Sequence, residues 1–180
     1  MINNINIAGL SEYVNEVKES KEQSKLHYGV NVDWISGMKT KATVKNMMLG
    51  DQKLVRNFSF DIDEPNQLLG LNSNPTPQEY LMAGVAGCMA VTFVAGASLL
   101  GITLDSLSLE FSGAINLSGF LGIETNEPTS FKEFTCNFLV SGNGTEEQYN
   151  LLKERVMKHS PNYASMVNGV NIVSKVIQNN

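Results

Sequence analysis

The order of predicted elements along the chain indicates an α+β fold, in which antiparallel sheets surround one long buried helix. Residues 80–104 carry no charged side chain and are rich in Ala, Gly, Leu, Met and Val. The segments before and after this stretch alternate apolar and polar residues, the period-two pattern of a β-strand. Strands, a long helix, more strands and a second helix in this order are typical of an α+β domain.

The central helix is predicted to begin at Pro77, because proline is accepted at a first helical position. Its sequence leaves no polar face, so the helix is expected to be buried nearly all round. Gly101 stands where a left-handed C-cap is expected. Small residues recur four apart and would let a second helix or a sheet approach closely: Ala83/Gly87, Gly84/Cys88 and Ala86/Ala90.

A membrane-spanning helix is the alternative for this stretch, since about 20 uncharged residues can cross a bilayer. However, acidic Glu79 and Asp105 flank it, and no Lys or Arg cluster lies nearby to set an orientation. The alternating strand patterns that follow also suit a soluble sheet. We therefore expect a soluble protein with no membrane partner.

Before the central helix, the pattern predicts one helix and three strands. Leu10, Tyr13, Val14 and Val17 recur at helical spacing and predict an amphipathic helix over residues 9–21. Alternation over residues 28–34 predicts a strand that ends at Gly37. Residues 43–49 and 54–62 form two further predicted strands, joined by a turn at Gly50-Asp51.

After the central helix, the pattern predicts strands over residues 104–117 and 134–140. A capping box, Thr145 to Gln148, begins a helix that runs to about Lys158 and ends before Pro161. A turn at Asn168-Gly169 then leads into a last predicted strand over residues 170–177.

The length of 180 residues predicts a single domain over residues 1–180, with residues 1–23 as an N-terminal helical extension. The net charge of −5 and the scattered lysines argue against nucleic acid as a partner. The first residues lack the features of a signal peptide. Two cysteines at unrelated positions suggest reduced thiols, so we expect a cytoplasmic protein.

Cys88 is the strongest candidate for chemistry. His27 and His159 have no close ligand spacing and the glycines form no phosphate-binding fingerprint, so neither a metal nor a cofactor is predicted. A reactive cysteine acts as the thiolate, and an unperturbed cysteine has a pKa of about 8.5. Cys88 lies three turns into the helix, beyond the reach of its dipole, so a cation would have to come from elsewhere. Candidates are Arg56, Arg155, Lys39, Lys41 and Lys45.

Cys88 and several other candidate residues also have a purely structural interpretation. A free cysteine is often a small buried hydrophobe, which applies to Cys88 and more strongly to Cys136, on the apolar face of its strand. Gln78 and Glu79 could cap the start of the helix or hold a base or cation near a pocket. Ser160 is most simply a residue that ends a helix.

The segment 77–88, Pro-Gln-Glu-Tyr-Leu-Met-Ala-Gly-Val-Ala-Gly-Cys, resembles the helix motif of the OsmC/Ohr family of osmotically inducible and organic hydroperoxide resistance proteins. The resemblance continues through Gly101-Ile102, residues 118–122, His159-Ser160-Pro161 and residues 168–170. It implies an OsmC-like intertwined homodimer and thiol-dependent reduction of organic hydroperoxides. By this resemblance Cys88 is the attacking, or peroxidatic, thiolate.

The chain departs from the family pattern at three places. The family's second, resolving cysteine precedes a proline, and here Ser160 occupies that position. The acidic residue expected ten positions before the attacking cysteine matches Gln78, with Glu79 next to it. The activating arginine has no clear match, and Arg56 is the nearest candidate. The chain therefore resembles a longer subgroup with Ser-Pro at the second site.

Three hypotheses follow. The first is a one-cysteine thiol peroxidase of the oxidative stress response, with Cys88 restored by an external thiol reductant. The second is a non-catalytic dimer that binds an apolar small molecule in an interface pocket, with Cys88 structural. In the third, Cys136 replaces the missing resolving cysteine.

Overall fold

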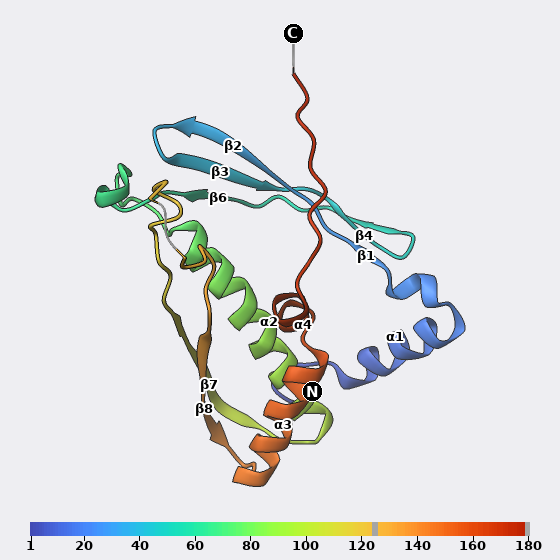
Figure 1. The fold of residues 1–180 in the computed structure, drawn as a ribbon. Helices are drawn as coiled ribbons and strands as arrows, with labels where there is room; N and C mark the ends of the chain where they lie inside the picture. The colour runs from blue at the N-terminus through green and yellow to red at the C-terminus, as the bar shows by residue number, and fades with distance from the viewer. Residues whose placement is uncertain (124–125, 179–180) are drawn as a thin grey trace. The chain divides into compact units, whose positions relative to one another are not determined.

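The computed structural model describes residues 1–123 and 126–178, and the chain within it forms two compact units. The N-terminal unit holds Met1 and residues 3–83, and the C-terminal unit holds Ile2 and the chain from Gly84 onward. Helix α2, Pro77–Leu99, is the long helix in Figure 1, and the boundary between the units falls inside it. The single domain over residues 1–180 stays a prediction.

The N-terminal unit begins with the predicted amphipathic helix, α1 (Ile7–Glu19), followed by a short 3-10 helix, η1 (Lys21–Ser24). The helix starts two residues earlier than expected because the Asn6 side chain caps it, accepting the Gly9 N–H at 3.2 Å. None of the α1 residues is buried.

Two three-stranded antiparallel sheets follow in the same unit (Figure 1). One has the order β1-β4-β5 and the other β2-β3-β6. Their strands are β1 (Leu26–His27), β2 (Val30–Ser36), β3 (Lys39–Val44), β4 (Met47–Leu49), β5 (Gln52–Leu54) and β6 (Ser59–Ile62). The predicted turn at Gly50-Asp51 is confirmed, because Leu49 pairs with Gln52 across it.

The two long strands predicted over residues 43–49 and 54–62 are wrong, since each is divided between the two sheets. The chain leaves one ladder after Val44 and enters the other at Met47. Between them the Asn46 side chain accepts the backbone N–H of Arg56 at 2.9 Å. A side chain that bonds the backbone in this way replaces a ladder hydrogen bond, and the apolar pattern does not reveal it.

The central helix is confirmed, and its end has the expected geometry. Gly101 has a φ of 75°, and the Ile102 N–H bonds the Ala97 carbonyl at 2.9 Å, the long hydrogen bond of a Schellman cap. Within the described residues, α2 is the one helix long and apolar enough to cross a membrane. A single such helix is weak grounds for a membrane span, because the core helix of a soluble protein has the same length and composition.

Burial of α2 all round is wrong for the single chain. One stripe is buried, including Val85, Met89 and Phe93. On another, a Cβ added to Gly84 or Gly87 would meet nothing within 4 Å, and Val91 is 66% exposed. The chain alone therefore covers only part of this helix.

In the C-terminal unit, β7 (Leu104–Gly113) and β8 (Phe134–Gly142) form an antiparallel hairpin. The strand predicted over residues 104–117 thus ends four residues early. Alternate residues of the hairpin pack with α2 and with helix α3 (Glu146–His159) around one apolar core. The buried members of this core are Val85, Met89, Phe93, Ala97, Ile102, Leu152 and Val156.

The predicted capping box at the start of α3 is confirmed in both directions, with Thr145 and Gln148 as its partners. The chain then enters α4 (Pro161–Asn168), a helix that the sequence pattern did not predict. The last predicted strand, over residues 170–177, is wrong: this segment forms no strand, and its apolar residues are exposed, Val176 by 98%. A strand needs a neighbour for its backbone groups, and the described chain pairs none with this segment.

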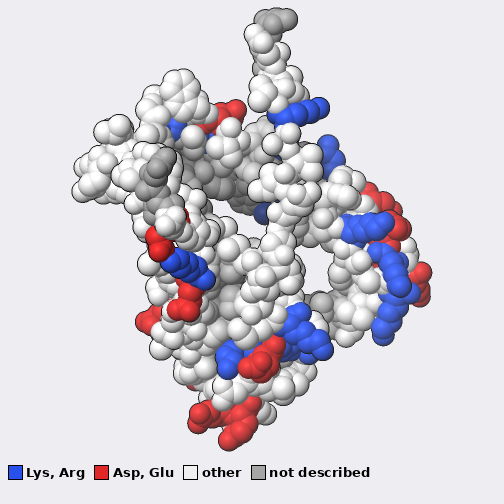
Figure 2. All heavy atoms as spheres, in the orientation of Figure 1, with Lys and Arg blue, Asp and Glu red and all other residues white. Residues whose placement is uncertain are grey.

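Charged side chains of both signs are interspersed on the face drawn in Figure 2. In several places on it Lys and Arg atoms lie next to Asp and Glu atoms, in agreement with the scattered lysines of the sequence.

Candidate functional site

Cys88 lies in the middle of α2 and is half-buried, with its sulfur free of any disulfide. One turn further along, the Thr92 hydroxyl donates to the Cys88 carbonyl oxygen at 2.8 Å. The thiol is therefore carried by a regular helix whose neighbouring turns form the core, at Val85 and Met89.

Ser160 lies at the junction of α3 and α4 and is held by both helices. Its N–H donates to the Val156 carbonyl at 2.8 Å, as the C-cap of α3. Its carbonyl accepts the Ala164 N–H at 3.0 Å, and its hydroxyl oxygen accepts the Tyr163 N–H at 3.4 Å, as the N-cap of α4. Pro161 at the first position of α4 suits this role, since a first-turn N–H would have no helical partner.

The two residues meet in the folded chain although 72 positions separate them. The Ser160 hydroxyl donates to the Cys88 sulfur across 3.3 Å, and Ser160 is fully buried. The Asn162 side-chain amide also donates to the Gly84 carbonyl at 2.8 Å, which ties α4 to the turn of α2 that precedes Cys88. Two hydrogen bonds, Ser160 to Cys88 and Asn162 to Gly84, thus connect the start of α4 to α2.

The other predicted site residues are Gln78, Glu79 and Arg56, which belong to the N-terminal unit, whereas Cys88 belongs to the C-terminal one. Glu79 accepts the Thr76 N–H at 2.7 Å, which is a cap at the start of α2. Their roles as activators therefore stay predictions.

Arg56 has unusual surroundings in its own unit. Its guanidinium lies over the Phe58 ring, 4.6 Å from the centroid. Its Nε is buried and has no hydrogen-bond partner among the described residues. A buried guanidinium nitrogen without a partner is costly, so this group is able to take a further acceptor.

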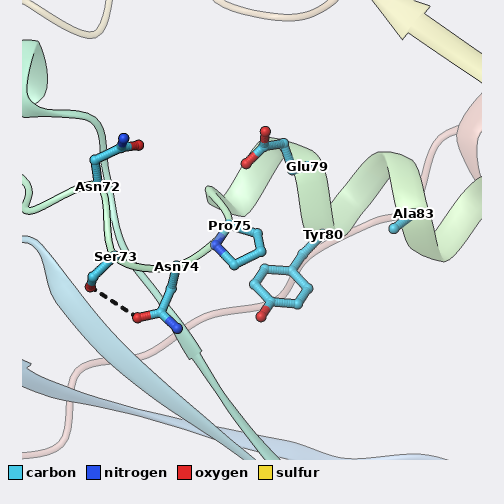
Figure 3. A pocket seen from close by; sticks show the side chains of 7 residues that line it. All are labelled: Asn72, Ser73, Asn74, Pro75, Glu79, Tyr80 and Ala83. Atoms are coloured by element: carbon cyan, nitrogen blue, oxygen red, sulfur yellow. Dashed lines mark hydrogen bonds between the residues drawn. The ribbon is translucent and has the colours of Figure 1, made fainter.

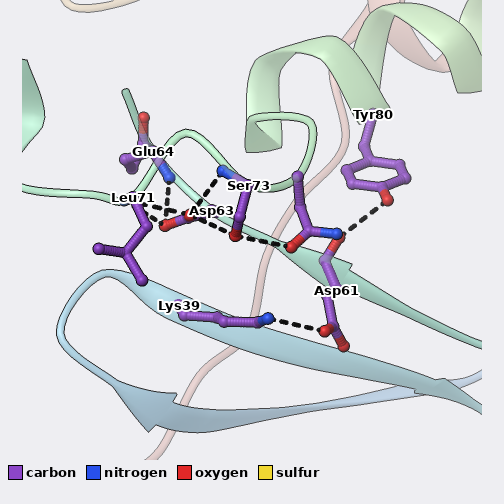
Figure 4. Close-up of polar contacts among 8 residues, drawn as sticks. Lys39, Asp61, Asp63, Glu64, Leu71, Ser73 and Tyr80 are labelled. Atoms are coloured by element: carbon purple, nitrogen blue, oxygen red, sulfur yellow. Dashed lines mark hydrogen bonds and ion pairs between the residues drawn. The ribbon is translucent and has the colours of Figure 1, made fainter. Parts of the chain in front are cut away.

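Beside the start of α2 the N-terminal unit has an open cavity of about 590 Å³, which the sequence did not predict (Figure 3). Glu79 and Tyr80 from the helix and residues 72–75 from the preceding loop line it. The Tyr80 hydroxyl donates to the Asp61 carbonyl at 2.9 Å, and Lys39 pairs with the Asp61 carboxylate at 3.0 Å (Figure 4).

Asp63 organises the loop that forms one wall of this cavity (Figure 4). It is 1% exposed and accepts hydrogen bonds from the backbone N–H groups of Ser73, Glu64 and Leu71 and from the Ser73 hydroxyl. These bonds, led by that of the Ser73 N–H, lower the pKa of Asp63 to about 2 against the opposing effect of burial. Gly70 is required nearby, because a Cβ there would lie 1.8 Å from the Glu64 carbonyl oxygen.

Cys136 has different surroundings. It lies on β8 and lines a cavity of about 470 Å³, together with the rings of Phe93, Phe138 and Tyr149. Burial raises the pKa of the Cys136 thiol. Cys88 is not among the residues that line this cavity.

The geometry of Cys88 and Ser160 suits nucleophilic chemistry at sulfur. Among residues 1–123 and 126–178, no group of three or more His, Cys, Asp or Glu side chains is placed to hold a metal ion. The sequence could identify Cys88 from its place in the motif and Ser160 from its place before Pro161. The sequence did not predict the contact between the two residues, because this contact depends on helix α4, which the sequence pattern did not predict.

Comparison with known proteins agrees with this architecture. The chain is similar to the crystal structure of an OsmC-like protein from Mycoplasma pneumoniae, with a TM-score of 0.61 and 18% identity over 80% of this chain and 89% of that one. An OsmC-like protein of unknown function from Vibrio cholerae has a TM-score of 0.61 and 12% identity, over 77% and 92% of the two chains. These likenesses show a shared fold.

An organic hydroperoxide resistance protein OsmC from Legionella pneumophila also shares the fold, with a TM-score of 0.51 and 16% identity over 78% of this chain and 88% of that one. A search among curated proteins gave no match. The family model of OsmC-like proteins matches residues 70–175, which is more than half of the chain and includes both Cys88 and Ser160. The chain belongs to the OsmC-like protein family.

Proposed function

We propose that this protein is a thiol-dependent peroxidase that reduces organic hydroperoxides through Cys88. One observation carries the proposal: Cys88 is half-buried, and a fully buried hydroxyl donates to its sulfur at 3.3 Å. Such a thiol is open to a small molecule and fixed in place. Membership of the OsmC-like family, together with the hydroperoxide resistance named for the Legionella pneumophila protein, supports this chemistry over a purely structural cysteine.

In the proposed reaction the Cys88 thiolate attacks the terminal oxygen of the hydroperoxide. A sulfur–oxygen bond forms, the oxygen–oxygen bond breaks, and the alkoxide leaves and takes a proton from water. Sulfur is oxidised by two electrons to the sulfenic acid, whose hydroxyl group contains the terminal oxygen of the peroxide. The rest of the peroxide is reduced to an alcohol.

We further propose a one-cysteine cycle, because Ser160 cannot form a disulfide with Cys88. An external small thiol condenses with the sulfenic acid to give a mixed disulfide and water. A second thiol then releases Cys88 and forms the external disulfide. This cycle fits a reducing compartment such as the cytoplasm.

The test is a thiol titration before and after one equivalent of cumene hydroperoxide. We expect one thiol to be lost in the wild-type protein and in Cys136→Ser, and none in Cys88→Ser. Paired loss of two thiols would indicate a Cys88–Cys136 disulfide instead. Loss no faster than that of a free thiol in solution would contradict the peroxidase proposal and leave Cys88 a structural residue.

We also propose that the protein is a homodimer whose second copy covers the open stripe of α2. The support is the space around Gly84 and Gly87, where an added Cβ meets nothing within 4 Å, and the 66% exposure of Val91. Small residues on a helix allow close approach of a partner. The exposed apolar segment 170–177 is a second surface that a partner would cover.

Gly87→Leu tests the dimer. The chain itself has room for the side chain, and leucine favours a helix over glycine by up to about 1 kcal/mol, so the fold should be retained. We expect the variant to be monomeric by analytical ultracentrifugation at concentrations where the wild type is dimeric. Glu12→Leu, at an exposed position of α1, is the control and should leave the oligomeric state unchanged. A monomeric wild type would refute the dimer.

A further inference from the structure

Ser160 has a polar contact that its role in joining two helices does not require. The helix junction uses its N–H, its carbonyl and the acceptor capacity of its hydroxyl oxygen. The hydroxyl proton is left over, and it points to the Cys88 sulfur at 3.3 Å. A hydroxyl has one donor, so this contact takes up the donor of Ser160.

We propose that Ser160 is a positioning residue for Cys88, whose hydroxyl donates a hydrogen bond that holds the reacting sulfur in one orientation; this inference rests on the proposed peroxidase function. The bond strengthens when the sulfur carries a negative charge, because hydrogen bonds to ionised groups are shorter and about twice as strong as neutral ones. One direction of approach to the sulfur is then occupied by the hydroxyl, and a peroxide must arrive from another.

The rigidity of the junction makes this role effective. Ser160 is fixed by hydrogen bonds to Val156, Ala164 and Tyr163, and α4 is tied to α2 through Asn162 and Gly84. A donor held on such a frame loses little freedom when the thiolate forms, which is the condition for effective preorganisation. Full burial of Ser160 also excludes water from competing for the same donor.

The experiment separates this role from helix capping. Ser160→Gly removes the donor but keeps an accepted N-cap, at a cost of only a few tenths of a kcal/mol. Ser160→Thr keeps both the donor and the cap. Thr145→Ala removes the N-cap of α3, which includes no contact with Cys88, and serves as the matched control for lost capping.

The measurement is the second-order rate of Cys88 alkylation by iodoacetamide at pH 7, followed by peptide mass so that Cys136 is scored separately. We expect Ser160→Gly to be slower by about tenfold, which corresponds to the loss of one hydrogen bond to a charged group. Ser160→Thr should restore the rate to within about threefold of the wild type, and Thr145→Ala should leave it unchanged.

An unchanged rate in Ser160→Gly would overturn the inference. Equal slowing in Ser160→Gly and Ser160→Thr, or equal slowing in Thr145→Ala, would also overturn it, by assigning the effect to packing or to capping. Alkylation needs no peroxide. A protein that fails to react with cumene hydroperoxide but shows the expected alkylation rates would therefore contradict the proposed function and leave the positioning role intact.

Discussion

Cys88 and Cys136 are both half-buried free thiols of the C-terminal unit, and they differ in what surrounds the sulfur. Cys88 lies on a helix and receives a hydrogen bond from a buried hydroxyl. Cys136 lies on a strand among aromatic rings, and burial raises the pKa of its thiol. Two half-buried thiols of one unit therefore need not have the same chemistry. The apolar surroundings of Cys136 disfavour the charged form of its thiol.

Ser160→Cys should change this comparison most, because it gives Cys88 a sulfur partner. The 3.3 Å between the Ser160 oxygen and the Cys88 sulfur must shrink to about 2.05 Å for a disulfide, a small movement. We expect one equivalent of cumene hydroperoxide to remove two thiols instead of one and to lower the mass by two hydrogens. Loss of a single thiol would show that the junction is too rigid to close the bond.

Phe93→Ala should have the next largest effect, a loss of unfolding free energy. Phe93 lines the same cavity as Cys136. Phe93 is 1% exposed, and its ring centroid lies 5.5 Å from that of Phe138, so truncation should cost about 3–5 kcal/mol of unfolding free energy. Denaturant unfolding measures this loss. Leu151→Ala, at a 61% exposed position, is the control and should change stability by less than about 0.5 kcal/mol.

The pH dependence of Cys136 alkylation should show a smaller effect, which follows from the burial of this thiol. Because burial raises the pKa of Cys136, its proton leaves at a higher pH, and less of the reactive thiolate is present at pH 8 than in an unstructured peptide. We expect Cys136 to react with iodoacetamide more slowly than such a peptide at pH 8, with a rate that continues to rise at a pH where the rate of the peptide has levelled off. The difference should disappear in denaturant, and its persistence there would contradict burial as the cause.

Asp63→Asn changes a residue of the N-terminal unit. It should lower stability. The charged carboxylate contributes stability that is fully present above its ordinary pKa of 3.8 and is lost as the pH falls through about 2. The unfolding midpoints of wild type and variant should thus differ most above pH 4 and converge towards pH 2. Asp61→Asn, which removes a partly exposed ion pair with Lys39, should have a smaller effect.

The sequence alone determined the α+β class, the central helix and its two ends, and the helix α3 whose N-cap is Thr145. These features depend on local chemistry: proline at a first helical position, glycine at a left-handed cap, and a capping box within four residues. Cys88 could be singled out for the same reason, from its place in a motif on that helix.

Only the tertiary structure decided which of these pieces meet. The strand predicted over residues 170–177 has the right residues but no neighbour within the described chain, and the ladder partner of a strand is not encoded in its own alternation. Helix α4 is only eight residues long, too short to be recognised from the sequence. Its N-cap, Ser160, is nevertheless the residue that contacts Cys88. Ser160 reaches Cys88 because two helices meet at one residue, a long-range contact that no local pattern carries.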